Sequence, residues 1–216
     1  IGPRTRAVMM SPVLGNPGNM DRLLDICQSA SVSLVLDNCD SLGSTWRGKL
    51  LNEYAIASSC SFYPAHHLCT MEGGMVSSND DETIKLARSI AWWGRDCHCV
   101  GVQNLMGCGM CGERFKEWLP DHDGIVDHKY VFTNRGYNLK PLDLQGAIGL
   151  VQLGKWEMIH DLRRHNKDAI GQILEKVPGA TVVDEHADAV TSWFGVPVVC
   201  DTADLKVRLV AHLESN

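Results

Sequence analysis

The order of apolar runs near the start of the chain most constrains its fold. Residues 6–10 form an apolar run that predicts a buried strand, and residues 32–36 form a second one that ends at Asp37. Between them, a loop rich in Gly and Pro over 11–19 leads to residues 20–29, whose apolar positions have helical spacing. A strand, a helix and a strand at this spacing predict a βαβ unit, and therefore a parallel sheet.

The rest of the chain continues this alternation of strands and helices. The predicted strands cover residues 55–62, 74–77 and 191–199, and the predicted helices cover 80–93, 142–176 and 203–214. The helical pattern over 142–176 fits either one long helix or two consecutive helices. Residues 94–136 contain Gly, Cys, Asp and His without a clear periodicity, which predicts a long functional loop.

Composition limits the class of protein. Hydrophobic residues make up 44% of the 216 residues and charged residues 21%, which is typical of a soluble protein with a core. The net charge of -6 does not favour binding to nucleic acid or to a membrane surface, and no apolar run has the length of a membrane span. Without a signal peptide, the sequence predicts a cytoplasmic protein. The chain starts at Ile1 and not at a methionine, so we expect an internal fragment of a longer protein.

Cysteines are frequent in this chain. Nine cysteines without a secretory signal predict metal binding or redox chemistry. Four of them lie within fifteen residues, at Cys97, Cys99, Cys108 and Cys111. Taken alone, this loop favours a zinc site with four thiolate ligands over an iron–sulfur cluster. Four more stand in apolar or strand-like contexts, which favours packing roles for Cys27, Cys60, Cys69 and Cys200.

Several polar residues follow the predicted strands. Asp37 stands at the carboxyl end of a predicted parallel strand, where open α/β sheets bind their ligands. The segment SFYPAHH adds a hydroxyl group, Ser61, and two imidazoles, His66 and His67, just before the Gly-rich turn MEGGMV. Taken singly, such residues more often belong to a turn, a core or a surface than to a functional site.

Together, these segments resemble the DegT/DnrJ/EryC1 family of sugar aminotransferases. The resemblance is carried by LVLDNCDSLGSTWRGK (34–49), SFYPAHH (61–67), EGG (72–74) and GYNLKPLDLQGAIGLVQL (136–153). It implies the α/β fold of fold-type I transferases that use pyridoxal phosphate (PLP), with a mixed, mostly parallel sheet and flanking helices. It also implies a portion of the large cofactor-binding domain over 1–155, loop included, and part of a smaller C-terminal α/β domain over 156–216.

The resemblance assigns roles to four residues. Family members act on nucleotide-linked keto sugars, and the lysine of an SF-x-x-x-K pattern holds PLP covalently; here that position is His66. Ser61 corresponds to the residue that binds the cofactor phosphate, Asp37 to the partner of the pyridine nitrogen, and Asn138 to the residue that reaches the phosphate in the neighbouring subunit of a homodimer.

Replacement of the lysine by histidine changes the expected chemistry. Imidazole cannot hold the cofactor covalently, which implies pyridoxamine phosphate (PMP) bound without a covalent link. Imidazole is nevertheless a suitable base for the proton on the C4′ carbon of the cofactor, and the protonated pyridine ring accepts the electrons. Dehydration of the sugar at C3 is therefore implied in place of transamination.

Cysteine spacing separates two groups of the family that share this histidine. In the iron–sulfur group, a [2Fe–2S] cluster is bound by a first Cys, fifty-seven residues, Cys-x-Cys and a fourth Cys. Cys39 and Cys97 are separated by fifty-seven residues, Cys99 follows, and RDCHC, CGERF and DHKY also resemble this group. The neighbours of Cys111 make it the fourth ligand, and Cys108 is the alternative.

The iron–sulfur group implies a reaction and its partners. The substrate is a CDP-linked 4-keto-6-deoxyhexose, electrons come from an NADH-dependent flavin iron–sulfur reductase, and the product enters dideoxysugar and O-antigen biosynthesis. Two alternatives stay open. One is a cluster-free PMP-dependent sugar 3-dehydratase, and the other is a non-catalytic fragment that binds zinc or an iron–sulfur cluster.

Overall fold

The computed structural model describes residues 1–96, 114–116, 119 and 121–215. The described residues form two compact units. The main unit consists of Ile1–Asn79 and Asp143–Asn216, and the inserted unit consists of Asp80–Leu142. None of the helices in the described part of the chain has both the length and the hydropathy needed to cross a membrane.

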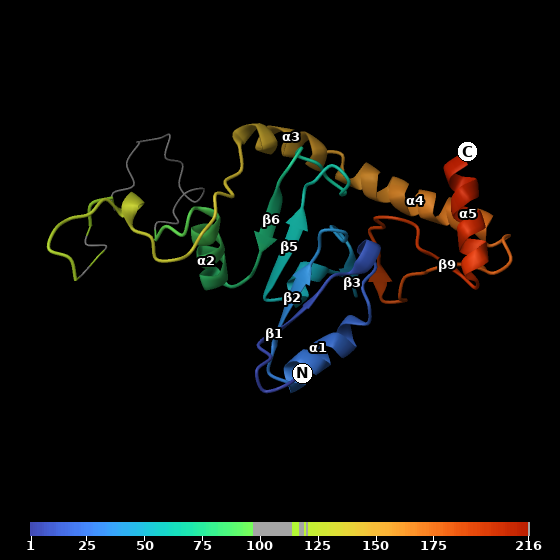
Figure 1. Cartoon of the computed structure of the whole chain (residues 1–216), viewed down its shortest axis with the longest axis horizontal. Helices are drawn as coiled ribbons and strands as arrows, with labels where there is room; N and C mark the ends of the chain where they lie inside the picture. Colours follow the sequence, from blue (N-terminus) through green and yellow to red (C-terminus); the bar gives the residue numbers. More distant parts are fainter. Residues whose placement is uncertain (97–113, 117–118, 120, 216) are drawn as a thin grey trace. The chain divides into compact units, whose positions relative to one another are not determined.

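A four-stranded sheet forms the centre of the main unit (Figure 1). Its strands are, in spatial order, β1 (Ala7–Met10), β2 (Ser33–Asp37), β5 (Ala57–Ser61) and β6 (Gly74–Ser77). Strands β1 and β5 run parallel to β2, and β6 runs antiparallel to β5. Helix α1 (Met20–Ser29) connects β1 to β2, so the predicted βαβ unit and the mixed, mostly parallel sheet are confirmed.

Helix α1 packs on β2 and supplies much of the main core. The predicted helix cap is present, because Asn19 Oδ1 accepts a hydrogen bond from the Arg22 amide at 3.0 Å. Met20 of α1 and Leu36 of β2 are fully buried. The other buried members of this core are Cys27, Val32, Leu34, Trp46, Leu51, Ala55 and Ala189. The core thereby fixes the carboxyl end of β2, where Asp37 stands.

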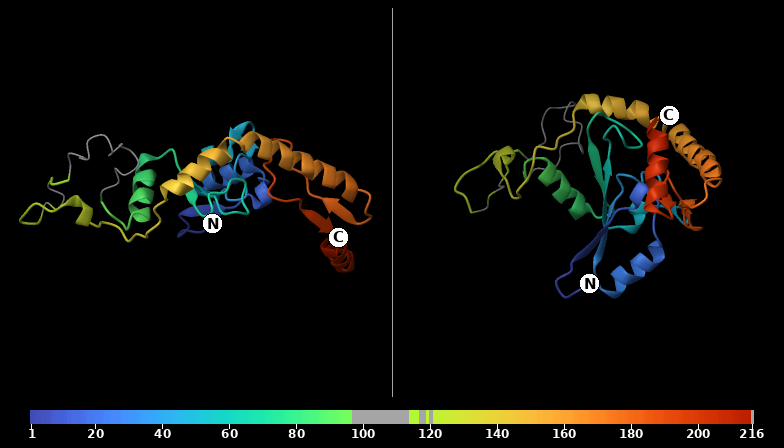
Figure 2. Two further views of the ribbon diagram at one scale, coloured as in Figure 1. Left: turned by 90° about the horizontal axis from the view of Figure 1, so that it is seen from above. Right: turned by 45° about the vertical axis from the view of Figure 1, so that its right-hand side comes forward.

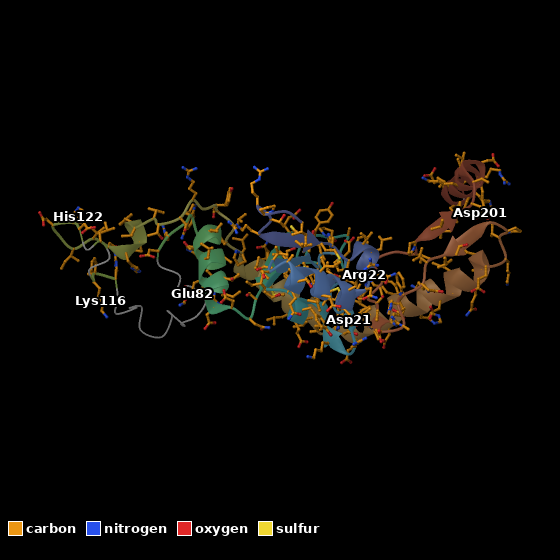
Figure 3. All side chains as sticks on the ribbon, turned by 90° about the horizontal axis from the view of Figure 1, so that it is seen from below. Asp21, Arg22, Glu82, Lys116, His122 and Asp201 are labelled. Atoms are coloured by element: carbon orange, nitrogen blue, oxygen red, sulfur yellow. The ribbon has the colours of Figure 1, made fainter. Side chains whose placement is uncertain are left out.

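A small antiparallel sheet joins the first and last parts of the main unit. Its strands are, in order, β4 (Lys49–Leu50), β3 (Thr45–Trp46) and β8 (Ala189–Val190). Trp46 is fully buried, and its Nε1 donates a hydrogen bond at 3.0 Å to Oδ1 of Asp21, a residue of α1 that is labelled in Figure 3. The sequence does not predict these strands, because two residues are too few to show a periodicity.

Helices and one strand pair follow in the C-terminal part of the main unit (Figure 2). They are α3 (Asp143–Leu153), α4 (Trp156–Leu174), β7 (Ala180–Val182), β9 (Val198–Cys200) and α5 (Ala203–Ser215). The helical pattern over 142–176 therefore forms two consecutive helices, separated at Gly154 and Lys155. Strand β7 pairs antiparallel with β9, α4 packs on β7, and α5 packs on β9. The domain boundary expected after residue 155 stays a prediction.

The strand predicted over 191–199 is wrong up to Pro197, and the run pairs as β9 only from Val198 on. Before that point, its backbone bonds to side chains from distant elements. The carbonyl oxygens of Thr191 and Ser192 accept hydrogen bonds from Arg164 and His67, respectively. Arg163 donates to the carbonyl oxygens of both Trp193 and Phe194. The amide of Ser192 donates to Ser44 Oγ. Buried backbone groups need partners, but an apolar run does not reveal whether these are a strand or side chains.

The inserted unit begins with α2 (Asp81–Ala91), as the sequence predicts. After this helix, an isolated antiparallel bridge pairs Trp92 with Asn138. The described part of the predicted 94–136 loop contains a short 3-10 helix at His128–Tyr130. Four cysteines of this loop, Cys97, Cys99, Cys108 and Cys111, lie outside the described residues.

We expect Leu36→Ala to lower the free energy of unfolding by about 2–5 kcal/mol, because the lost side chain leaves a cavity in the core beside α1. Leu213→Ala is the matched control, since Leu213 on α5 is 65% exposed. For the control we expect a change within about 0.5 kcal/mol. Urea denaturation of both variants measures the two effects, and equal losses would contradict the placement of the core.

Candidate active site

The carboxyl ends of β2 and β5 bring together the polar residues that the sequence singles out. Asp37 is the last residue of β2 and pairs in register with Ser59 of β5. Ser61 ends β5, and His66 lies in the loop that follows. Ser11, which comes after β1, donates a hydrogen bond from its Oγ to the Asp37 carbonyl at 3.2 Å. Ligands of open α/β sheets bind at this kind of edge.

Asp37 is held as an ionised carboxylate. Its Oδ1 accepts hydrogen bonds from Ser59 Oγ at 2.9 Å and from the Cys39 amide at 3.2 Å. Hydrogen bonding by Cys39, then by Ser59, lowers the pKa of Asp37 against the opposing effect of burial. An anionic carboxylate at this position can pair with the protonated nitrogen of a bound ring.

The turn after Asp37 orients His66. The Nδ1 atom of His66 lies 2.7 Å from the carbonyl oxygen of Cys39. Because a carbonyl oxygen only accepts hydrogen bonds, Nδ1 carries a proton, so Nε2 is the nitrogen that has the lone pair in the neutral form of the ring. Among the described residues, none forms a hydrogen bond with Nε2. His66 can therefore act as a general base through Nε2.

Two aromatic rings and a serine complete the surroundings of this base. The Phe194 ring lies 5.4 Å from the imidazole between centroids, and Tyr63 meets it edge-on at 6.1 Å. Ser61 Oγ accepts a hydrogen bond from the Tyr63 amide at 3.2 Å. The hydroxyl proton of Ser61 can still be donated to an anion, which suits the phosphate-binding role predicted for it.

The second imidazole of the SFYPAHH segment has a different environment. His67 is buried, and its Nε2 lies 3.0 Å from the Ser192 carbonyl, to which it donates. Burial lowers the pKa of His67 to about 4, so the ring stays neutral near pH 7. Its Nδ1 has no partner among the described residues. We therefore assign His67 to packing between the loop and the C-terminal segment, and His66 to chemistry.

Cys39 is the one predicted cluster ligand that lies within the described residues. Burial, followed by hydrogen bonding to Asp37, raises the pKa of its thiol to about 11, which favours the protonated form. The thiol lies 3.9 Å from Ser59 Oγ. No group of three or more His, Cys, Asp or Glu side chains suited to a metal occurs in the described part of the chain. The assignment of Cys39 to a cluster therefore rests on sequence spacing, and the cluster stays a prediction.

The remaining predicted site residue, Asn138, belongs to the inserted unit, where it bridges to Trp92. Its assignment to the phosphate of a neighbouring subunit stays a prediction.

Three residues of this site were missed from the sequence: Ser59, Phe194 and Arg163. The sequence does contain an indication for Ser59: it stands two residues before Ser61, and alternate residues of a strand share a face. Phe194 and Arg163 had none. They are separated from His66 by more than ninety residues, and the tertiary fold brings their segments together.

The chain matches the DegT/DnrJ/EryC1/StrS aminotransferase family over residues 1–216. The chain belongs to this family. Its main sheet is accordingly part of the PLP-dependent aminotransferase fold, as the sequence predicts.

Similar curated proteins of the family include sugar 3-dehydratases. The chain is 40% identical to dTDP-4-dehydro-2,6-dideoxy-D-glucose 3-dehydratase of Saccharopolyspora spinosa, over 99% of this chain and 46% of that protein. It is 36% identical to the lipopolysaccharide biosynthesis protein RfbH of Salmonella typhimurium, over 98% of this chain and 48% of that protein. The chain thus spans about half the length of these relatives.

Solved structures of the family support the same placement. The structure of E. coli GDP-4-keto-6-deoxy-D-mannose-3-dehydratase with bound hydrated PLP matches with a TM-score of 0.79 and 26% identity. The match covers 100% of this chain and 52% of that chain.

The residues at the sheet edge fit a phosphorylated pyridine cofactor of this family. Asp37 is an anionic partner for a protonated ring nitrogen, and Ser61 has a hydroxyl proton for a phosphate. His66 stands where the family pattern has its lysine, so the segment SFYPAHH contains no amine for covalent attachment.

We expect the stability of the protein to depend on pH through His67. Its pKa is about 4 when folded and 6.5 ordinarily, so the unfolded chain binds the proton more readily between these values. The contribution of neutral His67 is complete above pH 6.5 and is lost as the pH falls towards 4, by on the order of 3 kcal/mol. Urea denaturation across this range measures the loss.

His67→Gln should reduce this pH dependence, because Gln keeps a donor for the Ser192 carbonyl and does not titrate. His212→Gln is the control, since His212 is exposed on α5. An unchanged pH dependence in His67→Gln would contradict the assigned environment of His67.

Proposed function

We propose that the longer protein is a PMP-dependent sugar 3-dehydratase, which removes the C3 hydroxyl group of a nucleotide-linked 4-keto-6-deoxyhexose. One observation carries the proposal: His66 replaces the family lysine at the sheet edge where Asp37 stands, and its Nε2 forms no hydrogen bond with any described residue. The relatives named as sugar 3-dehydratases support it.

The residues of this chain would divide the work as follows. Asp37 pairs with the ring nitrogen and keeps it protonated, and Ser61 donates its hydroxyl proton to the cofactor phosphate. The bound cofactor supplies an electron sink for the sugar carbons. Nε2 of His66 would act as the base toward the bound cofactor, while the Cys39 carbonyl keeps Nδ1 in place. A histidine cannot hold the cofactor covalently, so the amine stays available for the keto sugar.

The nucleotide and the pathway are finer parts of the proposal. We propose CDP as the nucleotide, because the cysteine motifs resemble the group that uses CDP-linked sugars. Relatives are named for dTDP- and GDP-linked sugars, which makes these the alternatives to test. A role in dideoxysugar and O-antigen biosynthesis is supported by the relative named as a lipopolysaccharide biosynthesis protein. The role predicted for Asn138 requires a homodimer.

We further propose a [2Fe–2S] cluster on Cys39, Cys97, Cys99 and Cys111, reduced by an NADH-dependent flavin iron–sulfur reductase. The support is the fifty-seven-residue spacing between Cys39 and Cys97, with Cys99 two residues further on. The rival is a metal site formed by the loop cysteines alone, which would include Cys108 and leave Cys39 as the half-buried thiol beside Ser59.

We expect the full-length protein with PMP, supplied with two electrons by NADH and the flavin iron–sulfur reductase, to convert CDP-4-keto-6-deoxyglucose to a product that has lost the C3 oxygen as water. His66→Asn should slow the reaction by about 10²–10⁴-fold, because it removes the base. Mass spectrometry of the sugar product measures the conversion by the wild type and by His66→Asn, and dTDP- and GDP-linked sugars are tested in parallel. A wild-type protein that only transfers an amino group to the sugar would refute the proposal.

We expect no covalent PLP on the wild-type protein after borohydride reduction, because position 66 has no amine. His66→Lys should gain one equivalent of covalent PLP at this position. Peptide mass spectrometry locates the adduct, and His66→Asn is the control without an amine. An adduct at the same site in the wild type and in His66→Asn would show that another lysine holds the cofactor.

We expect Cys39→Ser to lower the iron and sulfide content of anaerobically purified protein if Cys39 is a ligand. Cys111→Ser should do the same, and Cys108→Ser should be tolerated. Cys200→Ser is the control, because Cys200 belongs to β9. Metal and sulfide analysis with visible spectra provides the measurement. If the metal content is unchanged in Cys39→Ser but falls in Cys108→Ser, the metal site belongs to the loop cysteines alone.

A further inference from the structure

Side chains hold the segment Thr191–Phe194 in place. The carbonyl groups of four successive residues accept from the side chains of Arg164, His67 and Arg163. On the other side, the Phe194 amide donates to the Leu14 carbonyl at 3.0 Å. A segment without a partner strand depends on such individual donors for its position.

Arg163 of α4 holds the end of this segment. Its Nη1 donates to the Trp193 carbonyl at 3.1 Å and to the Phe194 carbonyl at 3.0 Å. The guanidinium also lies 5.9 Å from the centroid of the Phe194 ring. Burial lowers the pKa of Arg163, and no described carboxylate pairs with it. The positive charge of the Arg163 guanidinium thus contacts two carbonyl oxygens and one aromatic ring, all from Trp193 and Phe194.

Phe194 transmits this restraint to the candidate base. Its ring lies 5.4 Å from the His66 ring, tilted by 43°. Elsewhere around the ring, the Cys39 carbonyl bonds Nδ1, Oδ1 of Asp40 lies 3.7 Å from the same nitrogen, and the Tyr63 ring stands edge-on. Cys39 and Tyr63 come from the sheet edge itself, whereas Phe194 comes from the C-terminal part of the main unit. A shift of Phe194 would open space for the imidazole to rotate away from the Cys39 carbonyl.

We propose that Arg163 is a positioning residue for His66: by holding Phe194, it keeps the imidazole in the Nδ1–H form with Nε2 presented as the base. The catalytic meaning of this inference rests on the proposed function. The orientation of the ring does not, because it is a property of the main unit alone.

Two substitutions of Arg163 separate the effect of its hydrogen bonds on the position of Phe194 from the effects of its charge and its size. Arg163→Lys keeps a cationic donor that can reach the two carbonyl groups, whereas Arg163→Met keeps an unbranched chain without a donor. Phe194→Leu removes the ring and leaves Arg163 in place. Arg164→Met is the matched comparison, since Arg164 bonds Thr191 at the far end of the segment and pairs with Glu185. Arg208→Met controls for lost charge, because Arg208 pairs with Asp204 on the exposed face of α5.

The first readout is the form of the His66 ring in the full-length protein. Nitrogen-15 chemical shifts of labelled imidazoles distinguish the Nδ1–H from the Nε2–H tautomer, and the His66→Asn spectrum assigns the signals. We expect a single Nδ1–H form in the wild type, in Arg163→Lys and in Arg208→Met. Arg163→Met and Phe194→Leu should show a mixture of both forms.

The second readout is the division between kcat and KM with the keto sugar. We expect kcat of Arg163→Met to fall by about ten- to a hundredfold with KM unchanged, because a displaced base affects the reaction more than binding. Arg163→Lys should recover most of this loss.

Two results would overturn the inference. One is an Arg163→Met protein with a wild-type tautomer and kcat. The other is an Arg164→Met protein, compared at equal distance below its unfolding temperature, with the same tautomer mixture and kcat loss. If the wild type shows the Nδ1–H form but no dehydration, the proposed function fails and the positioning of His66 by Arg163 stands.

Discussion

The short turn that leaves the end of β2 is the part on which the candidate site depends. In two residues it places an anionic carboxylate, Asp37, and a carbonyl acceptor, that of Cys39, at the same sheet edge. The carbonyl accepts the proton that His66 carries on Nδ1, and the carboxylate is the group that, in the proposed function, would keep the pyridine nitrogen of the cofactor protonated. Both functions require β2 to end at a constant position, which the buried contacts between Leu36 and α1 provide.

Adjacent histidines have opposite roles because burial differs between them. His67 is enclosed, has its pKa lowered to about 4, and bonds a carbonyl of the C-terminal segment. His66 keeps Nε2 open at the sheet edge while its other nitrogen is bonded. A single loop thus both contacts the C-terminal part of the chain through His67 and carries the proposed base, His66, on the neighbouring residue.

Helix α4 carries cationic side chains that bond backbone carbonyl groups of a segment without a partner strand. Arg163 and Arg164 bond carbonyl groups of the segment that leads from β8 towards β9. Lys167 lies over the Trp193 ring with its Nζ 5.1 Å from the centroid. These three side chains contact a stretch of backbone that has no ladder partner, and of the three only Arg163 bonds the carbonyl group of Phe194, whose ring lies beside His66. Side chains can do this at any angle, whereas a strand would impose the direction of its neighbour.

Local patterns in the sequence determined the βαβ unit, the cap at Asn19 and the helical character of 142–176, and they singled out Asp37, Ser61 and His66, because neighbours in sequence decide periodicity and motif spacing. The division of 142–176 into two helices came from the structure. The two-residue strands, the irregular course of Thr191–Pro197 and the approach of Phe194 and Arg163 to His66 were decided only in the tertiary structure. The reason is physical. A two-residue strand shows no periodicity, and an apolar or cationic side chain does not encode which backbone group it will meet, whether that group lies 27 residues away, as for Arg164 and Thr191, or 125 residues away, as for His67 and Ser192.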